Sequence, residues 1–596
     1  MRASKALSLI LLWATTFRVA IAQTEAKESA DAADQARRVG VITGRVVNDA
    51  GRPVAGAPIL IIKAGVKIAS GLQTASADDE GNFNATGLGP GSYMISINVP
   101  GYVVALTDSE SDYHRPGENV TINLVKGGVI TGRVTDSYGE PMVGVRVQAV
   151  KVRELEGGRK YSGGLQEPNG RLTDDRGVYR LYGLEPGIYV VGASSDTGGL
   201  YGGFYVGRDA MTWHPSSPRA TATEIAVRSG EEASGADIRH REERGHTISG
   251  TVAGDTASGS IGGGITIMLT SGADRQLVGM TGAYGMKNFA MSGVSDGEYE
   301  MAAFRMNPRD VDFASSTPRR VVVNGADVSG IELRIAPPAS ISGRVKIEPF
   351  TIVAARGAGK SPCEDGAHTK DRATIGDVLL SAAPEDASRP SIQSISPYLR
   401  YMSGAMGGAL DEKGEFTLSG LTAGRFRIKA DLPDDGWYLR AITQPASGSA
   451  KKTVDAARGV FMKAGEKLSG VEVVIAEGAA SLNGRVIPAN EGSKLPSHLR
   501  IHLIPAEASA TDDVLRYSEA TVRADGSFEF KHIAPGEYLL HTRQAAEKGA
   551  NNDQARPLAW DAIERAKLHR EAAAAKNEIE LKACDRVKEH VLRWRP

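Results

Sequence analysis

The chain has 596 residues and a formal net charge of −1 at pH 7, with 24% of its side chains charged. A single hydrophobic core does not extend over so long a chain, so we expect several domains. The near-neutral charge, with no basic block, argues against nucleic acid as a partner.

Residues 1–22 have the pattern of a secretory signal. Arg2 and Lys5 form a charged start, an apolar stretch runs to Phe17, and Ala20-Ile21-Ala22 offers a cleavage site of small residues before Gln23. A membrane anchor is the alternative, but the apolar stretch is too short to span a bilayer. We therefore expect export to the periplasm, the outer-membrane surface or the extracellular space. Residues 23–38 are polar and alanine-rich and predict a flexible leader, and no later stretch is long and apolar enough for a transmembrane segment.

One sequence pattern recurs along the chain and is clearest in residues 173–190, TDDRGVYRLYGLEPGIYV. A glycine is followed by an aromatic residue, a Gly-Leu pair, a Pro-Gly pair and a tyrosine at fixed spacing. Asp and Gly before the first strand are typical of a turn, alternation after it indicates a strand, and Pro-Gly predicts a second turn. Each copy therefore predicts a hairpin of two antiparallel strands. The copies are anchored on Gly81, Gly177, Gly285, Gly414 and Gly526.

Upstream of each copy stands a second recurring start, Gly-Arg-Val or Gly-Thr-Val, which predicts another strand. These starts begin at Gly44, Gly132, Gly250, Gly343 and Gly484. In the first two copies a Gly- and Pro-containing turn and a short apolar strand follow. Many short strands between Gly and Pro turns, with a long repeat period, predict a mainly β protein of tandem antiparallel sandwiches.

Taken together, the G-R-V start, the D-x-x-G-x-P-V-x-G-A turn and the D-x-x-G-x-F-x-x-x-G-L-x-P-G-x-Y segment resemble the carboxypeptidase regulatory-like domain, a transthyretin-like β-sandwich. The first two copies match over nearly their whole length, and the later three keep the start and the hairpin. The resemblance implies a non-catalytic sandwich, grouped with carbohydrate-binding-like folds and found beside peptidases, surface proteins and outer-membrane receptors. A fold of this kind does not by itself select a function.

The repeats divide the chain into predicted domains joined by short junctions, which favour a semi-rigid string. β-Sandwiches are predicted at 39–127, 128–243, 244–337, 338–477 and 478–546, with a loop-like insertion at about 351–400 in the fourth. Residues 547–596 predict a short helical tail: a helix from Leu558, a brief strand at Ile579 to Leu581, and an amphipathic helix through Val587, Val591 and Leu592. We expect the tail to cap the last sandwich, with docking on a partner as the alternative.

Residue patterns for catalysis or metal binding are weak. His240 and Glu243 match the H-x-x-E spacing of zinc carboxypeptidases, and His246 follows, but they stand at a junction between two sandwiches and lack the rest of such a site. Gly357 to Ser361 lacks the first glycine of a phosphate-binding loop. The acidic turns are better explained by turn formation than by calcium binding. We predict no catalytic residue, metal or cofactor. Export would permit a disulfide between Cys363 and Cys584, which the sequence cannot decide.

Aromatic residues outside the repeat are the candidate binding residues. Tyr205, Trp213, Trp437 and Tyr438 would each offer a flat apolar face on which a sugar could stack, and the alternative is that they pack inside or between sandwiches. The sequence thus predicts a non-catalytic exported binding or scaffold protein of the cell envelope, with a glycan as its ligand. The alternatives are an accessory subunit of an envelope peptidase or outer-membrane transporter and, less favoured, a zinc-dependent hydrolase. The oligomeric state is left open.

Overall fold

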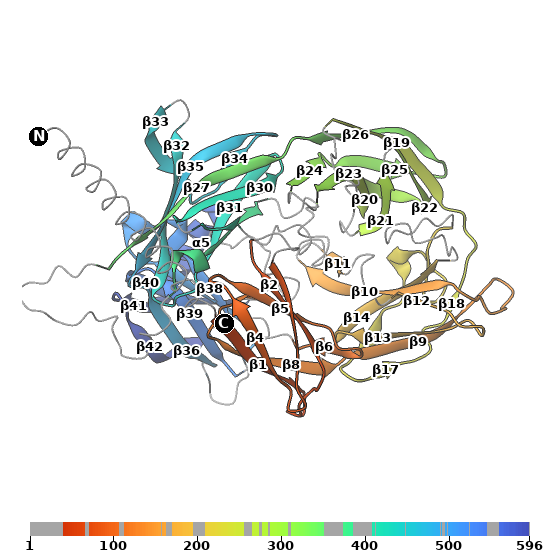
Figure 1. Cartoon of the computed structure of the whole chain (residues 1–596), viewed down its shortest axis with the longest axis horizontal. Helices are drawn as coiled ribbons and strands as arrows, with labels where there is room; N and C mark the ends of the chain where they lie inside the picture. Colours follow the sequence, from red (N-terminus) through yellow and green to blue (C-terminus); the bar gives the residue numbers. More distant parts are fainter. Residues whose placement is uncertain are drawn as a thin grey trace, which may run out of the picture.

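The computed structural model confirms the mainly β fold of tandem sandwiches, and the described residues include one α-helix, near the C-terminus (Figure 1). It describes residues 40–594 except 66–70, 106–112, 156–157, 163–169, 195–208, 255–264, 273–276, 284–286, 308–311, 351–372, 386–407, 412, 447–448, 489, 491–494, 497–498, 524 and 545–559. The predicted signal and leader, Tyr205, Gly285 and Cys363 lie outside the described residues. The disulfide considered between Cys363 and Cys584 involves one of these residues and so also falls outside the described part of the chain.

Module 1, built from β1 to β8, has two sheets packed face to face. One sheet has the order β4-β1-β8-β6 and the other β3-β2-β5-β7. Its core holds Ile42, Val46, Ile59, Phe83 and Leu124 from both sheets. The strands are β1 (Gly40–Asn48), β2 (Pro58–Lys63), β3 (Leu72–Ser76), β4 (Asn82–Leu88), β5 (Tyr93–Ile97), β6 (Tyr102–Val104), β7 (Tyr113–His114) and β8 (Asn119–Lys126).

Module 2 repeats this layout with β9 to β18. Strand β9 pairs with β13, β17 and β18, while β10 and β14 form the centre of the second sheet. Its elements are β9 (Gly128–Thr135), β10 (Arg146–Leu155), β11 (Gly158–Ser162), β12 (Arg171–Leu172), β13 (Val178–Leu184), β14 (Gly187–Ser194), β15 (Thr212–Trp213), η1 (Arg219–Thr221), β16 (Ile225–Val227), β17 (Glu232–Ala233) and β18 (Ile238–Arg239).

Module 3 joins its two layers into one sheet of order β21-β20-β23-β24-β26-β19-β22, because β24 pairs with both β23 and β26. Strand β25 pairs with β23 beside it. The strands are β19 (His246–Gly254), β20 (Ile265–Ser271), β21 (Leu277–Ala283), β22 (Asn288–Val294), β23 (Gly297–Asn307), β24 (Asp312–Ser316), β25 (Arg319–Val323) and β26 (Val328–Ala336).

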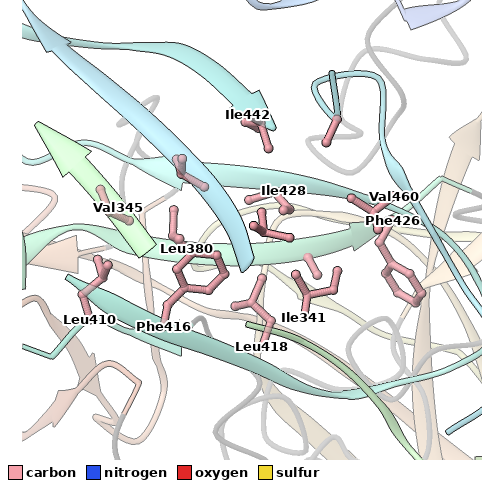
Figure 2. Packing of buried hydrophobic residues seen from close by; sticks show 14 of the residues in the cluster. Ile341, Val345, Leu380, Leu410, Phe416, Leu418, Phe426, Ile428, Ile442 and Val460 are labelled. Carbon is pink, nitrogen blue, oxygen red and sulfur yellow. The ribbon is translucent and has the colours of Figure 1, made fainter. Parts of the chain in front are cut away.

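Module 4 has sheets of order β30-β27-β35-β32-β33 and β29-β28-β31-β34. Figure 2 shows Val345, Leu380, Phe416 and Ile428 converging from both sheets into its core. Burying an aliphatic side chain of this size contributes about 1.5–3 kcal/mol. The elements are β27 (Ala339–Glu348), η2 (Ile375–Asp377), β28 (Leu379–Pro384), β29 (Gly408–Ala409), β30 (Glu415–Leu421), β31 (Gly424–Asp431), β32 (Trp437–Ala446), β33 (Ser449–Asp455), β34 (Val460–Met462) and β35 (Lys467–Glu477).

Part of the predicted insertion at about 351–400 belongs to this core. The segment described at 373–385 contains η2 and β28, and Val378 and Leu380 are fully buried. Strand β28 pairs with β31 over six residues. The loop-like expectation is therefore wrong for this segment. The apolar run of β28 is short and the residues around it are rich in Gly, Ala and Ser. This composition is typical of a loop, so the sequence did not indicate a strand that lies between two others in the sheet.

Module 5 has sheets of order β39-β36-β42 and β38-β37-β40-β41. Its elements are β36 (Ala480–Pro488), β37 (Leu499–Pro505), η3 (Ala508–Ala510), η4 (Val514–Arg516), β38 (Ser518–Thr521), β39 (Ser527–Ile533), β40 (Gly536–Gln544), α5 (Ala562–Ala575), β41 (Glu578–Leu581) and β42 (Arg586–Trp594). Among the described residues, no helix has the length and apolar character needed to cross a membrane.

The end of the chain corrects one prediction. The helix from Leu558 is present as α5 and the brief strand as β41, but residues 586–594 form a strand and not an amphipathic helix. Strand β42 pairs in parallel with β36, the first strand of the module. Val587 and Leu592 contact the module core. The spacing of these apolar residues is compatible with an edge strand as well as with one face of a helix, which is why the sequence suggested a helix.

The predicted hairpin also needs correction. Strands β4 and β5, on either side of the Pro-Gly turn, lie in different sheets: β4 pairs with β1, and β5 pairs with β2. The same separation holds for β13 and β14, which pair with β9 and β10. The turn therefore carries the chain from one sheet across to the other. In every module the first strand pairs antiparallel with the strand before the crossing turn. On its other side it pairs in parallel with a strand near the end of the module.

The modules follow one another around a ring rather than along a straight string (Figure 1). The ring closes where the turn before β5 meets η2 of module 4. There the backbone N–H of Gly91 donates to Asp377 Oδ1 at 2.8 Å, and Ser92 Oγ donates to the Asp377 carbonyl at 2.9 Å. Module 5 lies beside module 4, where the His532 ring nitrogen Nδ1 is 2.9 Å from the Trp437 carbonyl oxygen.

Candidate functional site

The acidic turns of the repeat hold the backbone together. In module 2, Asp174 Oδ1 accepts the backbone N–H groups of Arg176 and Val178, at 2.9 and 2.8 Å. Hydrogen bonds from Arg176 and from the backbone lower the pKa of Asp174. Asp78 and Asp411 accept the equivalent bonds in modules 1 and 4. Among the described residues, no group of three or more His, Cys, Asp or Glu side chains is placed to hold a metal ion.

The recurring glycine and the Gly-Arg-Val start meet at this turn. Gly177 has φ 74°, and its carbonyl accepts the Val134 N–H at 2.8 Å. A Cβ added to Gly177 would lie 2.6 Å from the Val134 carbonyl oxygen, so the close approach of the two backbones requires glycine. Arg133 Nε donates to the Arg176 carbonyl at 2.9 Å. The arginine of the start thus fixes the turn from the neighbouring strand.

The tyrosine that ends the repeat also has a structural role. In four modules its hydroxyl donates to the carbonyl oxygen four residues earlier, at 2.6 to 2.8 Å, which fixes the turn that crosses between the sheets. These residues are Tyr93, Tyr189, Tyr299 and Tyr538. Module 4 has Phe426 at the same place, buried in its core. The aromatic residues of the repeat therefore account for folding and leave ligand binding to other residues.

A hollow of about 670 Å³ opens on the outer face of module 1, over the sheet β4-β1-β8. The strands place exposed side chains there in two cross-strand rows. Asn84, Thr43 and Asn119 form one row, and Asn82, Arg45 and Thr121 form the other. The hollow is also lined by Ser76, Asp78, Gly44 and Phe83.

Most of the amide and hydroxyl groups in this hollow face solvent, and the hydrogen bonds within it involve Asp78, Asn82 and Arg45. Asp78 Oδ1 accepts the Asn82 N–H at 2.7 Å, and Asp78 Oδ2 lies 3.4 Å from the Asn82 side-chain nitrogen. Arg45 Nε donates to the Glu80 carbonyl at 3.0 Å, so the guanidinium is held by the turn before β4, as Arg133 is in module 2. The two ionised groups are of opposite sign, so the hollow is polar without a strong net charge.

The same face carries carboxylates in modules 2 and 4. Arg344 of module 4 lies opposite Glu415 on one neighbouring strand and Glu472 on the other. Arg180 of module 2 forms an ion pair with Glu232 at 3.1 Å. In module 1, Asn82 and Thr121 stand where module 4 has those two glutamates. The rows of module 1 are thus made of amide, hydroxyl and guanidinium groups.

Trp213 is not on the surface. It is 6% exposed and packs on β10 and β14 against Val150 and Val190. The Arg219 guanidinium lies over its ring at 5.6 Å from the centroid. A ring covered on its faces by aliphatic side chains and by arginine offers no platform for a sugar, so the stacking role predicted for this residue does not fit its position.

The other candidate aromatics give no exposed pair. Trp437 is 3% exposed and belongs to the core of module 4. Tyr438 is half-buried, and burial raises the pKa of its hydroxyl. Tyr205 lies outside the described residues. Trp437 therefore packs inside the sandwich, which was the alternative to sugar stacking. Like Trp213, it has no exposed ring face on which a sugar could stack.

The junction histidines point into different modules. His240 is 1% exposed, its Nδ1 accepts the Glu242 N–H at 3.1 Å, and burial lowers its pKa. His246 instead contacts Asp296 and Asp327 of module 3, at 3.3 and 3.9 Å. Because Nδ1 of His240 is already engaged and His246 faces away with other partners, the structure does not bring the two histidines into one ligand set.

The residues that line the hollow were missed in the sequence. Asn82 and Asn84 stand on either side of the repeat aromatic Phe83, where alternation predicts only that they face away from the core. Asn119 and Thr121 lie some thirty-five residues further on, and nothing local links them to β4. The available signal was the lack of acidic residues at the strand positions on either side of Arg45, which becomes visible only when the copies are set side by side.

Comparison with known families supports the resemblance for the first module. The model of the carboxypeptidase regulatory-like domain matches residues 41–124, which are β1 to most of β8. This confirms the family predicted for that part of the chain. No curated protein matches the chain.

Several solved structures are similar in part. The TIE protein of Bacillus anthracis is 14% identical, with 50% of this chain and 51% of that one covered, at a TM-score of 0.13. The minor pilin GBS52 of Streptococcus agalactiae is 15% identical over 34% and 96%, at 0.18. The shaft pilin SpaA of Lactobacillus rhamnosus GG is 11% identical over 34% and 97%, at 0.16. TM-scores this low carry no argument about what this chain does.

Proposed function

We propose that the chain is an exported, non-catalytic scaffold and binding protein of the cell envelope, with carbohydrate as its ligand class. The observation that carries this proposal is the set of contacts between modules. Gly91 and Ser92 of module 1 are joined to Asp377 of module 4, and His532 in β39 of module 5 is joined to β32. Sandwiches held in this way present their outer sheet faces in fixed relative positions, which suits a scaffold.

Two further observations support it. The N-terminal 22 residues have the pattern of a secretory signal. The first module matches the carboxypeptidase regulatory-like domain, which is a regulatory and not a catalytic unit by its name. The recurring polar residues that drew attention in the sequence serve the turns, as the bonds of Asp174 and Arg133 show.

The test of the ligand class uses the mature chain from residue 23. Purified protein is sedimented with insoluble peptidoglycan, chitin, cellulose and xylan, and the bound fraction is measured against protein concentration. We expect saturable binding to at least one of these polymers that a soluble fragment of the same polymer displaces. Absence of binding to all four would overturn carbohydrate as the ligand class.

The second candidate is an accessory subunit of an envelope peptidase or transporter. The specific observation in its favour is the family match, because regulatory-like domains stand beside a peptidase in the proteins that give the family its name. Cross-linking in intact cells separates the candidates. A single stoichiometric envelope protein, recovered also when polysaccharide has been digested away, favours the accessory subunit; recovery that depends on intact polysaccharide favours the carbohydrate-binding scaffold.

A further inference from the structure

We propose that the hollow on module 1, over β4, β1 and β8, is the carbohydrate-binding site and that it takes a short stretch of an uncharged polysaccharide. This inference rests on the proposed function and deepens it by naming the site and the kind of sugar. The hollow, of about 670 Å³, is an open depression on the sheet face, so it suits a ligand that lies along the surface as a stretch of polysaccharide does.

The sheet spaces the polar groups regularly. Side chains two residues apart on one strand and those paired across strands form a grid, because strands lie about 4.8 Å apart and alternate residues about 6.6 Å. Thr43 stands at the centre of one row, between Asn84 and Asn119. Arg45 stands at the centre of the other row. The sheet backbone fixes the Cα positions of these residues before a ligand arrives, so only the side-chain rotamers have to be ordered on binding.

The chemistry of the rows suits hydroxyl groups. An Asn side chain offers both an acceptor oxygen and two donor hydrogens, and a Thr hydroxyl donates and accepts. A sugar hydroxyl likewise does both, so each can pair with either kind of side chain. Phe83 lies beneath the face and is 4% exposed, so stacking does not contribute here. Recognition would rest on hydrogen bonds alone.

The charges in the hollow favour an uncharged ligand. Arg45 is the basic side chain among the lining residues, and Asp78 is the acidic one. A polyanion would gain from Arg45 and lose against Asp78. In module 4 the equivalent Arg344 lies between Glu415 and Glu472 in the strand register, and Glu472 forms an ion pair with Lys346.

The experiment compares three variants with the wild-type mature chain in the sedimentation assay. Asn84→Ala combined with Asn119→Ala removes both ends of one row, and Thr43→Arg fills its centre. Thr417→Ala of module 4 is the matched control, since Thr417 faces Ser342 as Asn84 faces Thr43. All four positions are exposed, so folding should be kept. We expect the double variant and Thr43→Arg to bind at least tenfold more weakly, from hydrogen bonds worth about 1 kcal/mol each, and the control to bind as wild type.

A second measurement needs no variant. Hydrogen exchange of the wild-type chain with and without a soluble fragment of the bound polymer should show added protection in β4 and β8, and none in β30 of module 4. Wild-type binding that all variants retain, with no protection in β4 or β8, would overturn this site and leave carbohydrate as the ligand class. No binding by the wild type would overturn both.

Discussion

At the scale of single residues, the repeat is maintained by backbone contacts. Gly81, Gly177, Gly414 and Gly526 share a positive φ, between 74° and 84°, and each leaves room for the carbonyl oxygen of the valine in the Gly-Arg-Val start. The valine N–H donates to the glycine carbonyl at 2.8 Å in all four modules. A side chain at the glycine would therefore strain φ and displace the first strand at once.

Replacing Gly177 by alanine should destabilise module 2 by about 2–3 kcal/mol, because the cost of a positive φ, about 1 kcal/mol, is added to the clash with Val134. Gly139→Ala is the control: φ is 91° there, but a Cβ would meet no atom within 4 Å. Hydrogen exchange of the peptide containing Val134 is the measurement. Equal loss of protection in both variants would contradict the role given to the close backbone approach.

At the scale of elements, strands flanking a repeat glycine were predictable, whereas their partners were not. Alternation around Phe83 and Phe416 identified β4 and β30 from the sequence. The pairing of β4 with β1 and of β5 with β2 depends on contacts across the module, which a local turn pattern does not encode. Strand β42 shows the limit: the spacing of Val587, Val591 and Leu592 fits a helix as well as an edge strand, and only its pairing with β36 decides.

Helix α5 shows how the end of the chain completes module 5. Leu568 and Ala572 pack on Ile504 and Leu539, on the outer face of β37 and β40. Asp561 caps the helix by accepting the N–H groups of Ile563 and Glu564, at 2.8 and 3.1 Å. The helix thus covers an outer sheet face, which agrees with the capping role expected for it. Charged residues lie at the edge of this contact, where Arg543 pairs with Glu564 at 3.3 Å.

His502 should make module 5 sensitive to acid. It is 3% exposed on β37, opposite His541, and burial lowers its pKa to about 4. In the unfolded chain its pKa is about 6.5. Well above pH 6.5 the imidazole is neutral in both the folded and the unfolded chain. As the pH falls from about 6.5 to 4, the unfolded chain binds a proton that the folded chain does not, so the free energy of unfolding decreases, by roughly 2 kcal/mol at pH 5.

The measurement is hydrogen exchange of the peptides from α5 and β40 between pH 7 and 4.5, corrected for the intrinsic exchange rate. His502→Leu keeps an apolar side chain in place and should flatten the pH dependence. His114→Gln in module 1 is the control and should leave it unchanged. Burial also lowers the pKa of His541, which adds a change in the same direction and survives in the His502 variant. A pH profile unaltered by His502→Leu would refute the assignment.

At the scale of the whole molecule, the closed ring decides how the hollow of module 1 is presented. Short junctions predicted a semi-rigid string, but whether the string folds back depends on contacts between distant modules. The segment that makes the closing contact, at η2, lies inside the predicted insertion and carried no recognisable pattern. Asp377 is 9% exposed there, and its Oδ2 accepts the N–H and hydroxyl of Thr374 at 2.7 and 2.9 Å. The carboxylate thus joins η2 to the Gly91 turn.

Asp377→Ala should therefore open the ring. The variant loses the acceptor for Gly91 N–H and for Thr374, and hydrogen bonds to a charged group are worth about 1.5–3 kcal/mol each, while the bond from Ser92 to the backbone carbonyl can remain. Small-angle X-ray scattering should show a larger radius of gyration, and the peptide containing Gly91 should lose protection against hydrogen exchange.

Asp411→Ala is the control. It removes a hydrogen-bond acceptor from a turn within module 4, and it should leave the radius of gyration unchanged. If the scattering curves of both variants superimpose on that of the wild type, other contacts hold the ring closed. Polysaccharide binding through module 1 should persist in the open form, since every residue that lines the hollow belongs to module 1.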